Sequence, residues 1–232
     1  MRAALTCCIG AKFPIGMQSR RSFLQQFFKR SFDVLVATSA LVVLSPFLLM
    51  VALAVRLSMG SPIFFRQPRP GRNDAVFEIV KFRTMSELIA EKSCVDDSTD
   101  TVRVSRLGAI LRRTSIDELP ELVNIVRGDM SIVGPRPLLV AYLDRYTDDQ
   151  RRRHDVRPGL TGLAQVSGRN ATTWDARLNL DVWYVDHQSF GLDLRIIART
   201  IGMVLTGRGV NAGPGITMTQ FDGSKTSTER HR

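Results

Sequence analysis

One apolar segment constrains this chain more than any other feature. Residues 32–57, FDVLVATSALVVLSPFLLMVALAVRL, carry one charge in the first turn, Asp33, and one near the end, Arg56. A straight helix of this length reaches roughly 39 Å, which exceeds the roughly 30 Å hydrocarbon core of a bilayer. The segment is too long for a signal peptide and no small-residue cleavage site follows it. It therefore predicts a membrane helix.

The dipeptide Ser45-Pro46 lies in the middle of this segment and predicts a bend, because proline removes a backbone hydrogen bond and clashes with the preceding turn. Each half alone reaches about 15–20 Å, too short to span. Basic residues flank the segment on both sides, whereas a spanning helix usually has its positive excess on one side. These features favour a re-entrant helix that dips into one leaflet. Kinked spanning helices also tolerate proline, so the residues alone leave both topologies open.

A second constraint is the stretch 112–137, RRTSIDELPELVNIVRGDMSIVGPRP. Apolar residues recur at helical spacing after Pro120, which suits the first turn of a helix, and Gly128 is a natural stop. Asp117 and Glu118 then lie at the helix start, where the dipole favours an ionised carboxylate. That placement suits a nucleophile or a metal ligand. The alternative is simple capping through a Ser115–Glu118 box, and this stretch alone does not decide between them.

The remaining chain predicts a small α+β domain. Two strands joined by a turn are expected over 61–84, with Lys81 on a cationic face. Residues 86–105 are polar and read as a surface loop, since the aspartates there lack EF-hand spacing. The run at 151–154 is interpreted as a solvated helix end. Helices are expected over 138–156, 174–190 and 193–205, the last amphipathic and facing either the core or a membrane surface.

Charge narrows the class of partner. The formal net charge of +10 implies a polyanion: nucleic acid, anionic lipid or a phosphorylated substrate. The three cysteines, Cys7, Cys8 and Cys94, have neither metal-ligand spacing nor the pattern of a disulfide framework. A reducing compartment is therefore expected.

Five motifs carry a resemblance to a known family: KFRTM (81–85), SIDELPELVN (115–124), GDMSIVGPRPLLV (128–140), RPGLTGLAQVSGRN (157–170) and LDVWYV (180–185). In this order they resemble the bacterial sugar transferases, the monotopic polyprenol-phosphate phosphoglycosyl transferases, over about residues 20–207. The short chain is most similar to the minimal form that starts glycan assembly with diacetylbacillosamine or a related amino sugar. Ser45-Pro46 matches the family's helix-breaking dipeptide, so the resemblance favours the re-entrant topology with both chain ends cytoplasmic.

The resemblance implies a reaction in which a UDP-sugar gives its phosphosugar to undecaprenyl phosphate, releasing UMP. It implies that Asp117 is the nucleophile of a phosphosugar-aspartyl intermediate and that Glu118 binds Mg²⁺. By the same alignment of motifs, phosphate or substrate binding is expected from a further set of residues: Lys81, Arg112, Asp129, Arg136, Gln165, Arg169 and Asn170. The enzyme class is a transferase of substituted phosphate groups, acting at the first membrane step of exopolysaccharide, O-antigen, capsule or glycoprotein assembly.

Together these readings give an α+β fold. It has an N-terminal re-entrant membrane helix broken at Ser45-Pro46, a small β-hairpin and a mainly helical cytoplasmic catalytic domain with amphipathic interfacial helices. The expected divisions are an extension (1–19), the membrane helix (20–58), the catalytic domain (59–206) and a tail (207–232). The expected location is the bacterial inner membrane, with anionic lipid as a partner.

Four questions stay open at this level: the function class, the sugar, the oligomeric state and the start site. A membrane-anchored basic module that binds nucleic acid or lipid would also fit the charge, but no RNA-binding or helix-turn-helix pattern is present and the acidic pair would be unexplained; no nucleic-acid partner is expected. A hexose-preferring member of the same family would share the chemistry. The sequence fixes neither the sugar nor the oligomeric state, so a homodimer is left open, as is initiation at Met1 or Met17.

Overall fold

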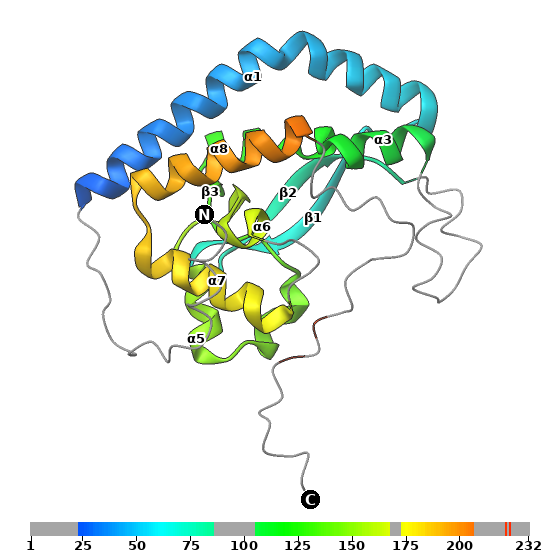
Figure 1. Cartoon of the computed structure of the whole chain (residues 1–232). Coiled ribbons are helices and arrows are strands. Elements are labelled where there is room, and N and C mark those ends of the chain that lie inside the picture. Colours follow the sequence, from blue (N-terminus) through cyan, green and yellow to red (C-terminus); the bar gives the residue numbers. More distant parts are fainter. Residues whose placement is uncertain (1–22, 86–104, 168–172, 207–220, 222, 224–232) are drawn as a thin grey trace, which may run out of the picture.

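The computed structural model describes residues 23–85, 105–167, 173–206, 221 and 223 (Figure 1). The chain forms one long N-terminal helix and a body of helices, 3-10 turns and two small sheets, which agrees with the predicted mixed class. The elements in order are α1 (Phe23–Met59), β1 (Phe64–Pro70), η1 (Arg72–Asp74), β2 (Val76–Phe82), α3 (Arg106–Thr114), η4 (Ile116–Glu118), α4 (Glu121–Arg127), β3 (Ser131–Val133), η5 (Val140–Arg145), α5 (Asp148–Arg151), η6 (Arg152–Asp155), β4 (Gly159–Thr161), α6 (Leu163–Val166), α7 (Trp174–His187) and α8 (Phe190–Thr206).

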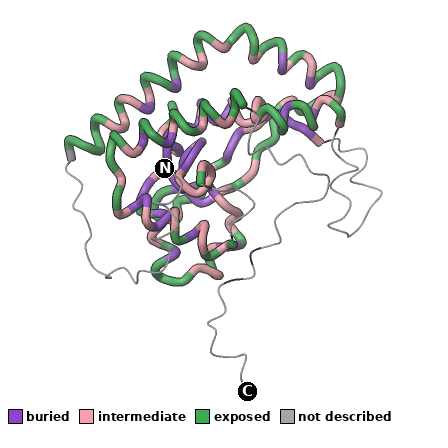
Figure 2. Tube along the Cα trace, in the orientation of Figure 1, coloured by how far each residue is buried: buried purple, intermediate pink, exposed green. Residues whose placement is uncertain are grey.

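The helix α1 arches over the body (Figure 1). Its 37 residues include Pro46 and continue through it without interruption, so the expected break at Ser45-Pro46 is a bend within one helix. The Ser45 Oγ donates to the Val42 carbonyl at 2.8 Å, a local bond of the kind that bends helices. Among the described residues α1 is the one helix long and apolar enough to cross a membrane, and only 11% of its most apolar window is buried. Figure 2 shows exposed and half-buried positions along most of the arch.

The N-terminal end of the arch, around residues 29–33, is called the first foot of α1. It is fixed to the body by polar side chains. Arg30 donates to the carbonyls of Ile125 at 2.7 Å and Val126 at 3.1 Å, at the end of α4. Asp33 accepts a hydrogen bond from Ser131 Oγ at 2.7 Å and from the Ile132 N–H at 3.3 Å. These bonds satisfy carbonyls at a helix C-terminus and an amide of β3, groups that need partners when buried.

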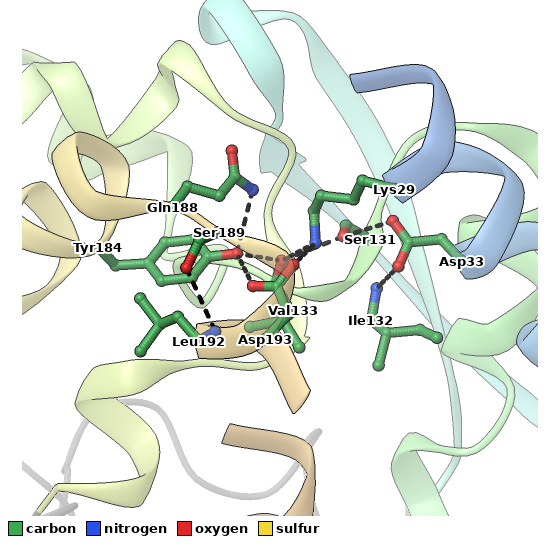
Figure 3. A network of polar contacts seen from close by, with 10 residues as sticks. All are labelled: Lys29, Asp33, Ser131, Ile132, Val133, Tyr184, Gln188, Ser189, Leu192 and Asp193. Atoms are coloured by element: carbon green, nitrogen blue, oxygen red, sulfur yellow. Dashed lines mark hydrogen bonds and ion pairs between the residues drawn. The ribbon is translucent and has the colours of Figure 1, made fainter. Parts of the chain in front are cut away.

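The same foot also enters a buried network with α7 and α8 (Figure 3). Lys29 Nζ lies 2.6 Å from Asp193 Oδ2, and the Tyr184 hydroxyl donates to Asp193 Oδ1 at 2.7 Å. The Asp193 residue is 3% exposed, so loss of Lys29 would leave a buried charge unpaired, which is strongly destabilising.

The second foot of α1 packs on the hairpin. Val51 and Val55 form a core cluster with Phe82 of β2 and Leu111 of α3. Arg83 donates to the carbonyl of Met59 at the end of α1 and to that of Ser61 just beyond it. Both ends of α1 are therefore attached to one and the same body.

The two sheets differ in how well they were predicted. The antiparallel β1–β2 hairpin pairs Phe64 with Phe82, as expected from the turn between two apolar runs. The parallel pair β3–β4, which aligns Ser131 with Gly159, was not predicted. A Cβ at Gly159 would lie 2.1 Å from the amide nitrogen of Gly134. Here glycine allows two segments of the chain to approach each other closely.

The helix expected over 138–156 is instead three short turns, η5, α5 and η6. Tyr146 and Thr147 are extended, and Thr147 begins α5 with a capping box to Gln150. The interpretation of the run 151–154 as a solvated helix end is wrong for two of its members. Arg153 is 1% and His154 7% exposed. Arg153 pairs with the buried Asp181, and His154 contacts the half-buried Asp74.

Candidate active site

The acidic pair lies on the turn η4, immediately before α4. Ser115 starts this turn in the left-handed conformation, with φ of 57°, and its side chain makes no capping hydrogen bond. The capping box is therefore absent. As predicted, α4 follows Pro120 and ends at Gly128, which has a φ of 107°.

Glu118 is held between two cations. Its Oε1 lies 2.7 Å from Lys81 Nζ on β2 and 2.6 Å from Arg136 Nη2. The Lys81 ammonium is also 3.0 Å from Glu121 Oε1. Burial would raise the pKa of Glu118, but Arg136 and Lys81 outweigh it and hold that pKa well below its usual range. Burial raises the pKa of Glu121 to about 7. Glu118 is thus a fixed negative charge beside two cations.

Asp117 has the opposite electrostatics. Burial and the neighbouring charge of Glu118 raise its pKa to about 6, although Lys81, Arg112 and Arg136 act to lower it. The sequence had led us to expect a dipole-stabilised, readily ionised group. The dipole effect is confined to a helix's first turn, and Asp117 lies on η4, ahead of α4. At neutral pH the carboxylate is still mostly ionised, but its ionised form is less stable than that of a solvent-exposed aspartate.

Beside the pair lies a cavity of about 560 Å³. Glu118, Arg112 and Arg136 are among its lining residues, while Asp117 is not. Apolar lining residues come from α8: Ile197, Ile201 and Val204. A cavity lined by both cationic and apolar side chains suits a ligand with phosphate and hydrocarbon parts.

Arg112 reaches the cavity from the last turn of α3 and is oriented by the segment that follows β2. Its Nε donates to Thr84 Oγ1 at 2.9 Å. The close approach of α3 to this segment depends on Gly108, where a Cβ would lie 2.0 Å from the Thr84 carbonyl oxygen. A side chain there would push α3, and Arg112 with it, away from the cavity.

Asp129, expected to bind substrate, is not among the residues that line the cavity and contacts Asn124. The fully buried Asn124 accepts a hydrogen bond from the Val80 N–H at 3.1 Å and donates to the Glu78 carbonyl at 2.7 Å. Asp129 Oδ2 accepts from the same amide at 3.2 Å. Asn124 thus ties α4 to β2 one residue before Lys81, so this arrangement places Lys81 relative to the acidic pair.

The remaining predicted residues divide between the cavity and parts not described. Gln165 lines the cavity, its Nε2 donates to the Leu160 carbonyl at 3.2 Å, and its buried Oε1 accepts no hydrogen bond from the described residues. Arg169 and Asn170 fall outside the described residues. The structure therefore gathers Lys81, Arg112, Glu118, Arg136 and Gln165 around one site, with Asp117 adjacent.

Two features of the site were missed. Buried Arg153 pairs with Asp181 at 2.7 Å and donates to the Arg136 carbonyl at 2.7 Å, which supports the loop carrying Arg136. Phe221, from the C-terminal part, is 2% exposed and packs 5.3 Å from Trp174, a residue of the cavity wall. The role of Arg153 was missed because the basic run 151–153 resembles a solvated helix end. The packing of Phe221 was missed because this residue stands in a stretch without periodicity.

Similarity to known proteins shows the family of this chain. The model of the bacterial sugar transferase family matches residues 24–207. The chain belongs to this family. The sugar transferase EpsL of Bacillus subtilis is 46% identical over 84% of this chain and 96% of its own length. The exopolysaccharide production protein ExoY of Sinorhizobium fredii is 42% identical over 78% of this chain and 87% of its own.

A third relative carries a more explicit name. The UDP-glucose:undecaprenyl-phosphate glucose-1-phosphate transferase of Caulobacter vibrioides is 42% identical over 77% of this chain and 70% of its own length. The family match spans the arched helix, the acidic pair and α8 alike. The protein is therefore a sugar transferase, and the matched residues include Glu118 and its two cationic partners, Lys81 and Arg136.

Proposed function

We propose that this sugar transferase moves a phosphosugar from a UDP-sugar to undecaprenyl phosphate, giving undecaprenyl-diphosphate sugar and UMP. The observation that carries this proposal is the acidic pair beside Lys81, Arg112 and Arg136, at a cavity with an apolar wall. The names of the relatives support it, since one is named for UDP-glucose and undecaprenyl phosphate and another for exopolysaccharide production. The reaction would be the first membrane step of exopolysaccharide or related glycan assembly.

The side chains of the site can hold both substrates. Arg112 and Arg136 can each donate two parallel hydrogen bonds to phosphate oxygens, a geometry that lysine does not offer. Arg136 is partly exposed and so accessible to an incoming diphosphate. The polyprenyl chain fits the apolar wall of α8, whose exposed Ile201, Val204 and Leu205 suit the membrane interface.

Asp117 would act as nucleophile in two steps. First, a carboxylate oxygen attacks the phosphorus that bears the sugar, the bond to the bridging oxygen breaks, and UMP leaves with that oxygen. Then an oxygen of undecaprenyl phosphate attacks the same phosphorus and releases the Asp117 carboxylate. Covalent catalysis of this kind divides one difficult displacement into two. The burial that raises the pKa of Asp117 also strips water from the attacking oxygen.

Glu118 is the residue that would bind Mg²⁺. Its carboxylate is ionised, lines the cavity and offers the oxygen donors that Mg²⁺ prefers. No group of three metal-ligating side chains gathers anywhere in the described ranges. Glu118 as a carboxylate donor fits an ion that is held by one or two carboxylates, with substrate phosphates completing its coordination. When bound, Mg²⁺ would neutralise charge on the diphosphate.

The arch of α1 supports a re-entrant topology. If α1 crossed the bilayer, its two ends would lie on opposite sides, yet Arg30 at one foot and Met59 at the other both contact the same body. The arch therefore enters one leaflet and returns, with the catalytic body on the cytoplasmic face of the inner membrane. The division into an extension, a membrane helix, a catalytic domain and a tail stays a prediction.

The test is UMP release in detergent with Mg²⁺, undecaprenyl phosphate and a panel of UDP-sugars. We expect release with the wild type and with Asp144→Asn, a matched change at an exposed aspartate, and none with Asp117→Asn. The preferred donor would separate an amino-sugar enzyme from a hexose enzyme. Substantial release by Asp117→Asn would exclude the covalent route. If folded protein released no UMP with any donor, the membrane-anchored basic binding module would be the favoured function.

A further inference from the structure

A second cavity lies at the first foot of α1, away from the acidic pair. Its volume is about 620 Å³, and it is bounded by α1, η1, the segment before β4 and the corner between α7 and α8. Part of its wall is drawn in Figure 3, where Lys29, Asp33 and Asp193 point toward one another across the foot. None of its lining residues takes part in the reaction proposed above.

Three arginines line this cavity, and none of them forms an ion pair within the described part of the chain. Arg30 and Arg157 donate to carbonyls around the C-terminus of α4, Arg157 through Nε to Gly128 at 2.9 Å. The side chain of Arg72, on η1, is exposed and makes no hydrogen bond or ion pair with any described residue, while its carbonyl accepts a hydrogen bond from the Ala75 N–H. Arg30, Arg72 and Arg157 line the same cavity. Burial and the positive charges of Arg30 and Arg72 lower the pKa of Arg157, although Asp33 acts to raise it.

The carboxylates of the cavity form no ion pair with these three arginines. Asp193 is paired with Lys29, and Asp33 is engaged by Ser131 Oγ and a backbone N–H. Asp155 is exposed on the same wall and pairs with none of the arginines. Unbalanced cations in a partly buried site favour a bound anion, and guanidinium groups match the geometry of phosphate oxygens.

The rim of the cavity is apolar. Phe28 is 67%, Leu35 67% and Phe190 52% exposed, and all three line it. A free phosphate ion would gain nothing from this rim, whereas the acyl chains of a lipid would cover it. The foot of a helix that enters a bilayer is also where headgroups lie.

We propose that this cavity binds the phosphate headgroup of an anionic phospholipid, with Arg72 and the free Nη groups of Arg157 as donors. The bound lipid would balance the arginines and fix the foot of α1 at the membrane surface. This site rests on the membrane placement proposed for α1 and is independent of the transfer reaction, so its test measures binding and not turnover.

The test is native mass spectrometry and thermal unfolding of the full chain in detergent, titrated with phosphatidylglycerol, phosphatidylcholine or inorganic phosphate. We expect one retained phosphatidylglycerol per chain and a rise in Tm with its concentration. Arg72→Gln should weaken this binding about tenfold, the loss of one hydrogen bond to a charged group. Because Arg72 is exposed and unpartnered, this variant should fold normally.

The matched control is Arg66→Gln, which removes the same charge from an exposed arginine on the adjoining strand β1. It should bind phosphatidylglycerol like the wild type. Equal binding by Arg72→Gln and the wild type would overturn the site. Equal losses in both variants would show diffuse attraction by a basic chain, and equal stabilisation by inorganic phosphate or phosphatidylcholine would overturn its assignment to an anionic lipid.

Discussion

The raised pKa of Asp117 predicts that the proposed nucleophile destabilises the fold. Its value moves from 3.8 to about 6 on folding, and each unit corresponds to about 1.4 kcal/mol. Stability should fall as pH rises from about 4 to 6, because in that window the folded state binds more protons than the unfolded state. Above pH 6 the full cost, roughly 3 kcal/mol, is present. Asp117→Asn mimics the neutral form and should recover most of it.

The assay is thermal unfolding in detergent at pH 7.5 and at pH 4, without substrate or Mg²⁺. For a chain of this size roughly 3 kcal/mol corresponds to a rise in Tm of about 6–12 °C. We expect Asp117→Asn to be more stable than the wild type at pH 7.5 and equal to it at pH 4. Asp144→Asn, at an exposed position, should change neither value. A less stable Asp117→Asn at pH 7.5 would show that the site favours the ionised carboxylate, contrary to this reasoning.

Three further outcomes are expected. Pro46→Ala should straighten α1 toward a spanning helix and expose one end to periplasmic cysteine labelling; if both ends stay cytoplasmic, Pro46 does not set the topology. Gly108→Ala should lower Tm and activity together, because its methyl meets the Thr84 carbonyl at 2.0 Å, whereas unchanged UMP release would mean that α3 can shift freely. Asp129→Ala should lower kcat with little change in the KM for UDP-sugar, with Asp129→Asn restoring it; a rise in KM alone would instead indicate substrate contact.

The parts of the fold that follow from local rules were predictable. The bounds of α4 were set by Pro120 and Gly128, and the hairpin by a turn between two apolar runs. The bent apolar helix likewise followed from Pro46. Each of these depends on residues that are near one another in sequence, where propensity and periodicity act directly.

What could not be predicted depends on contacts between distant residues. No residue near Lys81 in the sequence indicates that its side chain binds Glu118, 37 positions later. Arg153 has the same composition around it as a solvated helix end, and only its partner Asp181, 28 positions away, makes its burial tolerable. The motif resemblance supplied Lys81 and Arg136 as site residues. Physical reasoning from the sequence alone would have left both as surface cations.

The attachment of the first foot of α1 sets an order of events during synthesis. Arg30 contacts a residue 95 positions later, and the partner of Lys29 lies 164 positions later. At about 5–20 residues per second, the ribosome needs roughly 8–30 s to make that span. During this interval α1, which is long and apolar enough to cross a membrane, has emerged without the groups that fix its first foot. Nascent chains should therefore depend on a chaperone or insertase to shield α1 until Asp193 has been made.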